Sequence, residues 1–264
     1  MPELPDVEVF KRYMEATSLH QTISETEVPN PEMLKNVSAG EFQAKTRGRQ
    51  FDSTRRHGKY LFAHLSSGDW VMMHFGMTGL LEYLRQGVEV RPHSRVIFNF
   101  DNGYRLAYVN QRKLGRVMLT DDVDAFVRKH ELGPDVLDPR FDLQAFRRAL
   151  GDSRGTIKSA LMDQERFSGI GNEYSDEILF QSRVHPETKV TSLREQDLKD
   201  LFRSMKKVLQ TAIDAGADPD RFPASYLLTQ RHQAGKCPAC GGNVKTIKVS
   251  GRTAYFCPKC QVHK

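Results

Sequence analysis

The residues with the clearest capacity for chemistry are the chain's four cysteines, which form two Cys-x-x-Cys pairs. Cys237 and Cys240 make the first pair, Cys257 and Cys260 the second, with residues 241–256 between them. This spacing predicts one tetrahedral zinc site in which each pair holds one side of the ion. Four thiolates leave no position for water, so the predicted zinc ion is structural. The alternative is two disulfides in a secreted protein, but no apolar leader opens the chain, which favours zinc.

The sequence around the cysteines predicts a cationic hairpin. Residues 244–249 and 252–256 have strand character on either side of the turn signal Ser250-Gly251. From residue 221 to the last residue there is no Asp or Glu, and the chain has a net charge of +6. The basic residues of this stretch are Arg221, Arg231, Lys236, Lys245, Lys248, Arg252, Lys259 and Lys264. Such a module suits a phosphate backbone, although a solvated face that offsets the zinc–thiolate charge is the alternative.

A second reactive pair, Pro2 and Glu3, follows Met1. A small residue at position 2 allows removal of Met1, which would leave Pro2 with a secondary amine. An α-amino group titrates at about 7.7–8.0, so a fraction is neutral and nucleophilic at the pH of a cell. Attack of such an amine on an aldehyde-level carbon gives an iminium ion, and Glu3 could move the protons. The alternative is an ordinary first helical turn, where proline and glutamate are both common.

The elements that must position these residues change type along the chain. A helix over residues 7–16 is followed, from about 20 to 120, by short stretches rich in β-branched and aromatic residues. Strands are predicted over residues 71–75, 95–100, 104–108 and 116–119, with a hairpin turn at Asn102-Gly103. Helical periodicity then predicts helices over residues 141–150, 157–162, 173–180 and 198–213. The regular short strands favour a sandwich or a barrel, with a helical domain and the zinc module after it.

Composition limits the class of protein. The chain has 264 residues, of which 39% are hydrophobic and 27% charged, as expected for a soluble globular protein. It contains no apolar run long enough to cross a membrane. Without a leader, the expected location is the cytoplasm.

Five motifs, in order, resemble the formamidopyrimidine-DNA glycosylase/endonuclease VIII family of bifunctional DNA glycosylase/AP lyases. They are the start at residues 2–8, Gly58-Lys59-Tyr60-Leu61, the segment His74 to Gly79, the pair of segments at 157–163 and 169–174, and residues 251–261. The resemblance implies an α+β multi-domain fold. Its parts are an N-terminal β-sandwich with an N-terminal helix (residues 1–130), a helix–two-turn–helix domain (131–226) and a C-terminal zinc ribbon (227–264).

The resemblance also implies a reaction and a partner. Pro2 would attack C1′ of a damaged nucleoside, Glu3 would act as the general acid/base, and Lys59 would assist at the phosphates. Release of the base would be followed by β,δ-elimination, which nicks the strand. The implied partner is double-stranded DNA with a damaged base or an abasic site, bound at the nucleoid by a monomer with one structural zinc ion.

The residues implied to contact DNA are His74, Met77, Arg112, Leu114, Lys158, Asn172, Tyr174 and Arg252. Asn172 follows two glycines at a predicted helix start, where backbone N–H groups favour an anion, although an ordinary N-cap is the alternative. Lys59, Asn172 and Arg252 would hold phosphates around a nucleotide extruded from the duplex. Met77, Arg112 and Leu114 would fill the space it leaves, although Met77 and Leu114 could instead be core residues.

Two departures from the family pattern concern base preference. Lys113-Leu114-Gly115 stands where the formamidopyrimidine branch usually has Arg-Phe-Gly, and residues 218–225 leave little room for the loop that caps oxidised purines. Selectivity for oxidised pyrimidines, or weak selectivity with dominant lyase action, is therefore left open. The alternative function is a catalytically silent zinc-ribbon protein that binds damaged DNA with the same fold.

Overall fold

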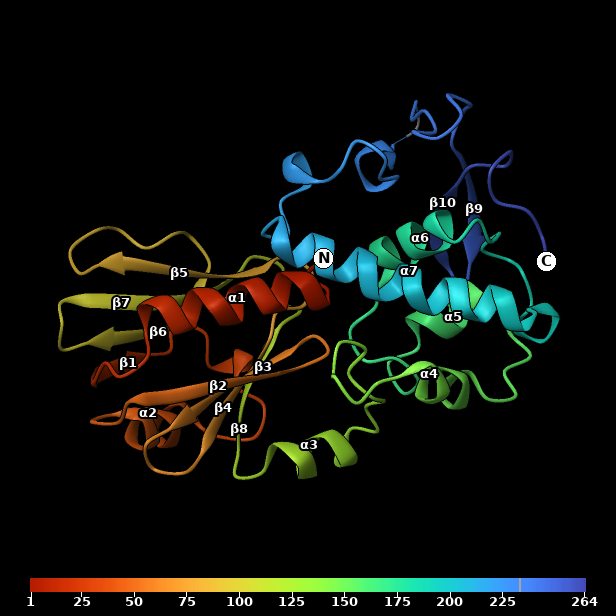
Figure 1. Ribbon diagram of the computed structural model, residues 1–264. Coiled ribbons are helices and arrows are strands. Elements are labelled where there is room, and N and C mark those ends of the chain that lie inside the picture. Colours follow the sequence, from red (N-terminus) through yellow and green to blue (C-terminus); the bar gives the residue numbers. More distant parts are fainter. Residues whose placement is uncertain (233) are drawn as a thin grey trace. The chain divides into compact units, whose positions relative to one another are not determined.

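The computed structural model describes residues 1–232 and 234–264 (Figure 1). The chain forms two compact units, which are described separately below. Unit 1 comprises Met1–Pro2 and Asp6–His130, and unit 2 comprises Glu3–Pro5 and Glu131–Lys264. The short segment Glu3–Pro5 thus packs with residues that lie far away in the sequence. The finer boundary predicted between residues 226 and 227 stays a prediction.

Unit 1 is a β-sandwich of two four-stranded antiparallel sheets. One sheet has the order β1 (Ile23–Glu27), β6 (Ser94–Phe100), β7 (Tyr104–Asn110) and β5 (Gly79–Arg85). The other has the order β2 (Phe51–His57), β3 (Tyr60–Leu65), β4 (Trp70–His74) and β8 (Arg116–Thr120). The helices are α1 (Leu4–Thr17), η1 (Pro31–Met33), α2 (Ala39–Thr46) and α3 (Val123–Lys129). The predicted sandwich and N-terminal helix are confirmed.

Aromatic and branched side chains fill the interior of the sandwich. Phe51, Phe98 and Phe100 are each at most 1% exposed, and α1 adds Val7 and Met14 to the same cluster. All seven residues of β6 are buried, including the polar Ser94, Arg95 and Asn99, so their side chains need hydrogen-bond partners inside the protein. Most side chains of β2 are partly exposed, so its sequence does not alternate between apolar and polar residues. The sequence therefore predicted strands in this region without giving the bounds of β2.

The described residues of unit 2 form four α-helices and a hairpin. The helices are α4 (Leu143–Leu150), α5 (Ile157–Met162), α6 (Asn172–Gln181) and α7 (Glu195–Asp214). Short 3-10 helices are η2 (Val190–Ser192), η3 (Pro219–Arg221) and η4 (Leu228–Gln230), and the hairpin is β9 (Lys245–Val249) with β10 (Arg252–Phe256). The amphipathic face of α7 packs Leu201, Met205 and Val208 into the core of this unit. The predicted helices and hairpin correspond to these elements within a few residues.

Helix α6 is the central element of unit 2, because every residue from Tyr174 to Phe180 is buried. Polar members of this run therefore need partners inside the protein. The Glu177 carboxylate accepts hydrogen bonds from Gln181 Nε2 at 2.7 Å and from Leu228 N at 2.8 Å. Burial raises the pKa of Glu177 to about 7, although these hydrogen bonds oppose the shift.

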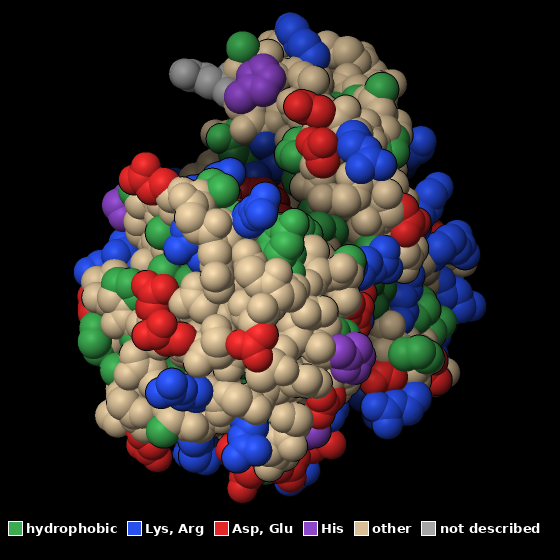
Figure 2. Space-filling view, turned by 90° about the vertical axis from the view of Figure 1, so that its left-hand side faces the viewer, with side chains coloured by type: hydrophobic (Ala, Val, Ile, Leu, Met, Phe, Trp, Pro, Cys, Tyr) green, Lys and Arg blue, Asp and Glu red, His purple; other side chains and the backbone are tan. Residues whose placement is uncertain are grey.

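The surface of the protein carries both signs of charge. Figure 2 shows Lys and Arg side chains interspersed with Asp and Glu on one face, so the net charge of +6 gives no single-sign surface there. Among the described residues, no helix combines the length and apolar character needed to cross a membrane.

The raised pKa of Glu177 predicts a pH-dependent stability. Folding takes up a proton between pH 4.5, the usual pKa of the carboxyl, and about 7. The free energy of unfolding should therefore fall by about 3 kcal/mol as the pH rises through this window, and then level off. Urea unfolding of Glu177→Gln should lack this pH-dependent component, whatever the stability of the variant at a single pH. Glu165→Gln, an exposed matched control, should keep the pH profile of the parent; identical profiles for parent and Glu177→Gln would contradict the assignment.

Candidate active site and zinc centre

The carboxylate of Glu3 is buried at the N-terminus of α6. Its oxygens accept hydrogen bonds from Gly171 N at 2.6 Å, Glu173 N at 2.9 Å and Tyr174 N at 3.4 Å. The side chain of Glu3 has no exposed surface. These amides are among the groups that a helix leaves unsatisfied at its start, and the helix dipole favours a negative charge there. The anion site predicted at this helix start is thus occupied by a carboxylate of the protein itself.

Position 171 must be glycine for this contact to exist. A Cβ atom built on Gly171 would lie 2.4 Å from the carboxyl carbon of Glu3, well inside van der Waals distance. Any larger side chain at this position would force the buried carboxylate or the backbone to shift. The glycine at this position therefore sets where the carboxylate next to Pro2 lies.

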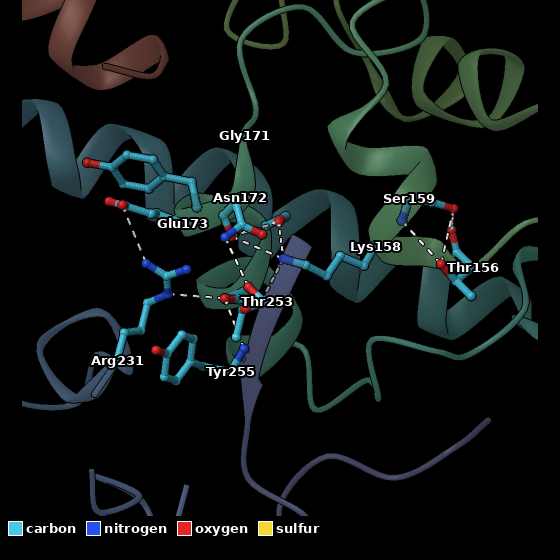
Figure 3. Close-up of polar contacts among 12 residues, drawn as sticks. Thr156, Lys158, Ser159, Gly171, Asn172, Glu173, Arg231, Thr253 and Tyr255 are labelled. Atoms are coloured by element: carbon cyan, nitrogen blue, oxygen red, sulfur yellow. Dashed lines mark hydrogen bonds and ion pairs between the residues drawn. The ribbon is translucent and has the colours of Figure 1, made fainter. Parts of the chain in front are cut away.

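Lys158 and Asp176 form a buried ion pair close to the start of α6. Figure 3 shows the Lys158 side chain extending towards Asn172 at this helix start. Lys158 Nζ lies 2.6 Å from Asp176 Oδ1 and also donates to Asn172 O at 3.0 Å and Ser175 Oγ at 2.8 Å. Burial lowers the pKa of Lys158, while Asp176 opposes this by stabilising the ammonium. Because the side chain of Lys158 is 0% exposed, its placement supports a positioning role and not the predicted contact with DNA.

The second oxygen of Asp176 connects α6 to the C-terminal hairpin. Asp176 Oδ2 accepts hydrogen bonds from Arg231 Nε and from Tyr255 N, both at 3.1 Å. Arg231 also lies over the Tyr255 ring, 5.0 Å from its centroid. Figure 3 shows Arg231 between α6 and the β10 strand that carries Tyr255. This arginine of the acid-free tail is therefore committed to contacts within the protein.

Asn172 makes a further link to the hairpin. Its Nδ2 donates to Thr253 O at 3.0 Å, whereas its Oδ1 is buried without a hydrogen-bond partner among the described residues. Tyr174 is 4% exposed and packs in the core of unit 2. Arg252, by contrast, is exposed at the first position of β10, beside the turn of the hairpin. Of the predicted contact residues in this unit, Arg252 is the one that clearly faces solvent.

The four cysteines lie together with the spacing of a tetrahedral metal site. The sulfurs of Cys237 and Cys260 are 3.7 Å apart, and those of Cys240 and Cys257 are 3.6 Å apart. A zinc ion with bonds of about 2.3 Å holds its sulfur ligands about 3.8 Å apart. All four cysteines are unbridged, which excludes the disulfide alternative. The donor set and its geometry fit one structural zinc ion.

Unit 1 places a lysine and a histidine near one another on its second sheet. Lys59 lies in the tight turn between β2 and β3 and is 9% exposed, and His74 ends the neighbouring strand β4. Burial, together with the charges of Arg116 and Lys59, lowers the pKa of His74 to about 4. His74 Nδ1 accepts a hydrogen bond from Gly76 N at 3.3 Å, so its proton lies on Nε2. At neutral pH this ring is an uncharged donor beside two cations.

Two loops of unit 1 that touch each other both expose a large apolar side chain. Met77, on the β4–β5 loop, is 40% exposed, and Leu114, on the β7–β8 loop, is 52% exposed. A Cβ atom on Gly76 would lie 2.5 Å from Leu114 C, and Arg112 N donates to Thr78 Oγ1 at 3.2 Å, so the loops are in contact. The alternative that Met77 and Leu114 belong to the core is wrong. Exposed apolar side chains on neighbouring loops are typical of a surface that meets a partner.

The comparisons with known proteins agree with this geometry. Three family profiles match the chain: "Formamidopyrimidine-DNA glycosylase N-terminal domain" over residues 1–117, "Formamidopyrimidine-DNA glycosylase H2TH domain" over 132–223, and "Zinc finger found in FPG and IleRS" over 235–262. The chain belongs to the formamidopyrimidine-DNA glycosylase family. The formamidopyrimidine-DNA glycosylase of Oceanobacillus iheyensis is 34% identical, over 100% of this chain and 99% of that protein.

Solved structures of the family have the same fold. A complex of the Lactococcus lactis Fpg with abasic-site DNA superposes with a TM-score of 0.88 at 30% identity, covering 98% of this chain and 99% of that one. A complex of the wild-type Lactococcus lactis protein with DNA that contains N7-benzyl-Fapy-dG gives the same TM-score, identity and coverage. The family, the fold class and the structural zinc ion predicted from the sequence are confirmed.

Three residues of the polar networks around the start of α6 and around His74 were not predicted from the sequence. Asp176 and Arg231 connect α6 to the hairpin, and Arg116 donates to Tyr60 Oη at 2.7 Å beside His74. A signal was available for Arg231, because it stands alone among uncharged residues shortly before the first cysteine pair. No comparable signal marks Asp176, because an acidic residue in a helix is usually on the surface.

Loss of the zinc ion should disorder the hairpin and weaken DNA binding. Cys260→Ala removes one ligand, and a small module of this kind owes its folding to the metal. We expect zinc content to fall below one equivalent, and affinity for lesion DNA to drop about tenfold or more as phosphate contacts are lost. Elemental analysis and fluorescence anisotropy measure the two effects. Ala239→Ser, an exposed position between the first two ligands, is the control; a zinc-free Cys260→Ala protein with normal affinity would show that the ribbon is dispensable.

Proposed function

We propose that this protein is a bifunctional DNA glycosylase/AP lyase of base excision repair that uses the amine of Pro2 as its nucleophile. The observation that carries the proposal is the buried carboxylate of Glu3, held by the amides of α6 directly beside Pro2 in the chain. A helix start that is built to orient one carboxylate next to a potential N-terminal amine is difficult to explain for a protein that only binds DNA. Membership of the glycosylase family supports the same reaction.

The proposed first step transfers the sugar from the base to the protein. After removal of Met1, the lone pair of the Pro2 nitrogen attacks C1′, the bond between C1′ and the base breaks, and the base leaves with its bonding electrons and a proton. Glu3 supplies and accepts protons as the sugar ring opens and the amine loses its own proton. The product is an iminium ion between Pro2 and C1′.

The iminium ion then makes strand cleavage possible. Removal of a proton from C2′ sends electrons towards the positive nitrogen, and the 3′ phosphate leaves; a second elimination expels the 5′ phosphate. Phosphates leave more readily when cations and hydrogen-bond donors stabilise their charge. We assign this role to Lys59, with the uncharged His74 donating from Nε2, and we assign Arg252 to the DNA backbone.

The extruded nucleotide leaves a gap in the duplex that must be filled. Met77 and Leu114 offer flexible or wedge-shaped apolar groups on touching loops, and Arg112 on the same loop as Leu114 offers a guanidinium for the unpaired base. Their exposure supports this assignment, since insertion into DNA would bury apolar surface that is now in water. Asn172 and Tyr174 are assigned, with Lys158, to the positioning of the α6 start.

Borohydride trapping tests the proposed nucleophile. Reduction converts the iminium ion into a stable covalent bond, so the processed parent should be trapped on abasic-site DNA. A protein with one extra residue ahead of Pro2 has no free proline amine and should not be trapped, although it should still bind the DNA. Trapping of the extended protein at the rate of the parent would rule out Pro2, and intact-mass measurement verifies both N-termini.

Glu3→Gln tests the role of the carboxylate. Base release should fall about 10²–10⁴-fold, the usual contribution of a general acid/base. Cleavage at a ready-made abasic site should fall less, because no base has to leave. Gln would place an N–H group against the N–H groups of α6, which could displace the start of the helix. Binding of abasic-site DNA is therefore measured for both proteins, because a displaced helix start should weaken it. Equal rates of base release for Glu3→Gln and the parent would exclude this role.

The departures in sequence predict an order of substrates. Leu114 should probe the opposite strand less firmly than an aromatic residue, and the short segment before the zinc ribbon should leave the base pocket open on one side. Base readout needs buried donors and acceptors around the flipped base, whereas phosphate contacts do not depend on the base. Single-turnover rates should be highest on an abasic site, lower on an oxidised pyrimidine or a ring-opened purine, and lowest on 8-oxoguanine. Fastest excision of 8-oxoguanine opposite cytosine would contradict this order.

The proposed setting follows from the sequence predictions. We infer that the protein acts as a monomer on double-stranded DNA in the cytoplasm, at the nucleoid. Sedimentation of the free protein and of its DNA complex tests the monomer.

A further inference from the structure

A second group of metal-ligating side chains lies outside the four-cysteine centre. His185, Glu187 and His263 each offer a ligand atom, and these atoms all lie within 4.8 Å of one another. The rings of His185 and His263 are 4.0 Å apart between centroids, with an angle of 31° between their planes. His185 is 8% exposed, whereas Glu187 and His263 are exposed. Neither the zinc ribbon nor the proposed reaction uses this cluster.

The fold itself brings these three residues together. Thr188 N donates to His185 O at 2.9 Å and closes a tight turn that follows α6 and carries both His185 and Glu187. His185 N in turn donates to Val262 O at 3.0 Å, directly before His263. Two hydrogen bonds of Gln261 fix the tail further, since its Nε2 donates to Val184 O at 3.0 Å and its Oε1 accepts from Cys257 N at 2.8 Å. Backbone and Gln261 hydrogen bonds therefore bring the three residues of the cluster together.

One ring of the cluster is also held in orientation. The His185 ring packs edge-on against Phe256, with centroids 4.6 Å apart and planes at 80°. Its Nδ1 accepts a hydrogen bond of 3.2 Å from Glu187 N, which is long for an N–H donor. A metal ion bound through this nitrogen would replace only that one bond. His185 can thus act as a fixed ligand to which the two exposed side chains adjust.

We propose that His185, Glu187 and His263 form a second metal site, which binds a divalent transition-metal ion and fastens the C-terminal tail to the turn after α6. Two imidazoles and one carboxylate suit zinc, nickel or copper, and they differ in kind from the four thiolates of the ribbon. A tetrahedral ion with bonds of about 2.1 Å holds its ligands roughly 3.4 Å apart, so the cluster must contract. Rotation of the exposed Glu187 and His263 side chains supplies this movement, and water completes the coordination.

Metal titration of the full-length, zinc-loaded protein tests the site with Ni²⁺ as the probe. Isothermal titration calorimetry should show one equivalent of Ni²⁺ bound, while a colorimetric chelator detects no zinc released from the cysteines. His263→Gln should weaken this binding at least tenfold and Glu187→Gln should weaken it less. His232→Gln changes an exposed histidine of the same unit outside the cluster and should bind Ni²⁺ like the parent. The unfolding temperature of the parent should rise with Ni²⁺, and that of His263→Gln should not.

Three results would overturn the proposal. The parent could bind no additional equivalent of Ni²⁺, His263→Gln could bind it as tightly as the parent, or binding could release zinc stoichiometrically from the four cysteines. Because His263 is exposed, His263→Gln should fold and retain one equivalent of zinc, which elemental analysis verifies. These measurements do not depend on glycosylase activity. A negative result would therefore contradict the metal site and leave the proposed function untouched.

Discussion

The seating of the Glu3 carboxylate on the amides that begin α6 is the interaction on which the rest of the structure depends. A carboxylate without exposed surface is costly unless strong donors surround it, and a helix start is one of the few places that offers several aligned N–H groups. The contact ties residues 3–5 to a helix almost 170 positions further along the chain. It also fixes the residue that follows Pro2, so the chemistry proposed for Pro2 would take place next to a group held by a buried helix.

Helix α6 is also linked by hydrogen bonds and ion pairs to the zinc ribbon. Lys158 and Arg231 share the carboxylate of Asp176, which also receives the backbone N–H of Tyr255. A buried carboxylate with two cationic partners and one amide is compensated, whereas removal of either cation would leave a partly unpaired buried charge. The hairpin is therefore fastened twice, by the zinc ion at its base and by Asp176 along β10. Single substitutions at this node should affect both the helix and the ribbon.

Unit 1 differs from unit 2, because the side chains proposed to enter the DNA, Met77 and Leu114, are exposed on loops of a stiff sandwich. Asn110 Nδ2 donates to Phe75 O at 2.9 Å, and Tyr108 Oη donates to His74 O at 2.7 Å. These two hydrogen bonds hold the chain in place just before Met77, which itself remains 40% exposed. A rigid base with free side chains at the tip is suited to insertion into DNA, since only the side chains need to adjust. The same base holds His74 in an environment that keeps it uncharged.

The sequence by itself determined the parts of this protein whose residues are close together along the chain. Spacing alone predicted the four-cysteine zinc ion, the hairpin with its Ser250-Gly251 turn, and the helix over residues 157–162, because turn, helix and knuckle geometries are local. Motif order identified the family. Only the tertiary structure decided that the anion at the start of α6 is Glu3, that Lys158 is buried, and that His185 and His263 meet. These are contacts between segments that lie far apart in the sequence. The periodicity of a sequence indicates which face of a helix or strand is apolar, but not which other element packs against that face.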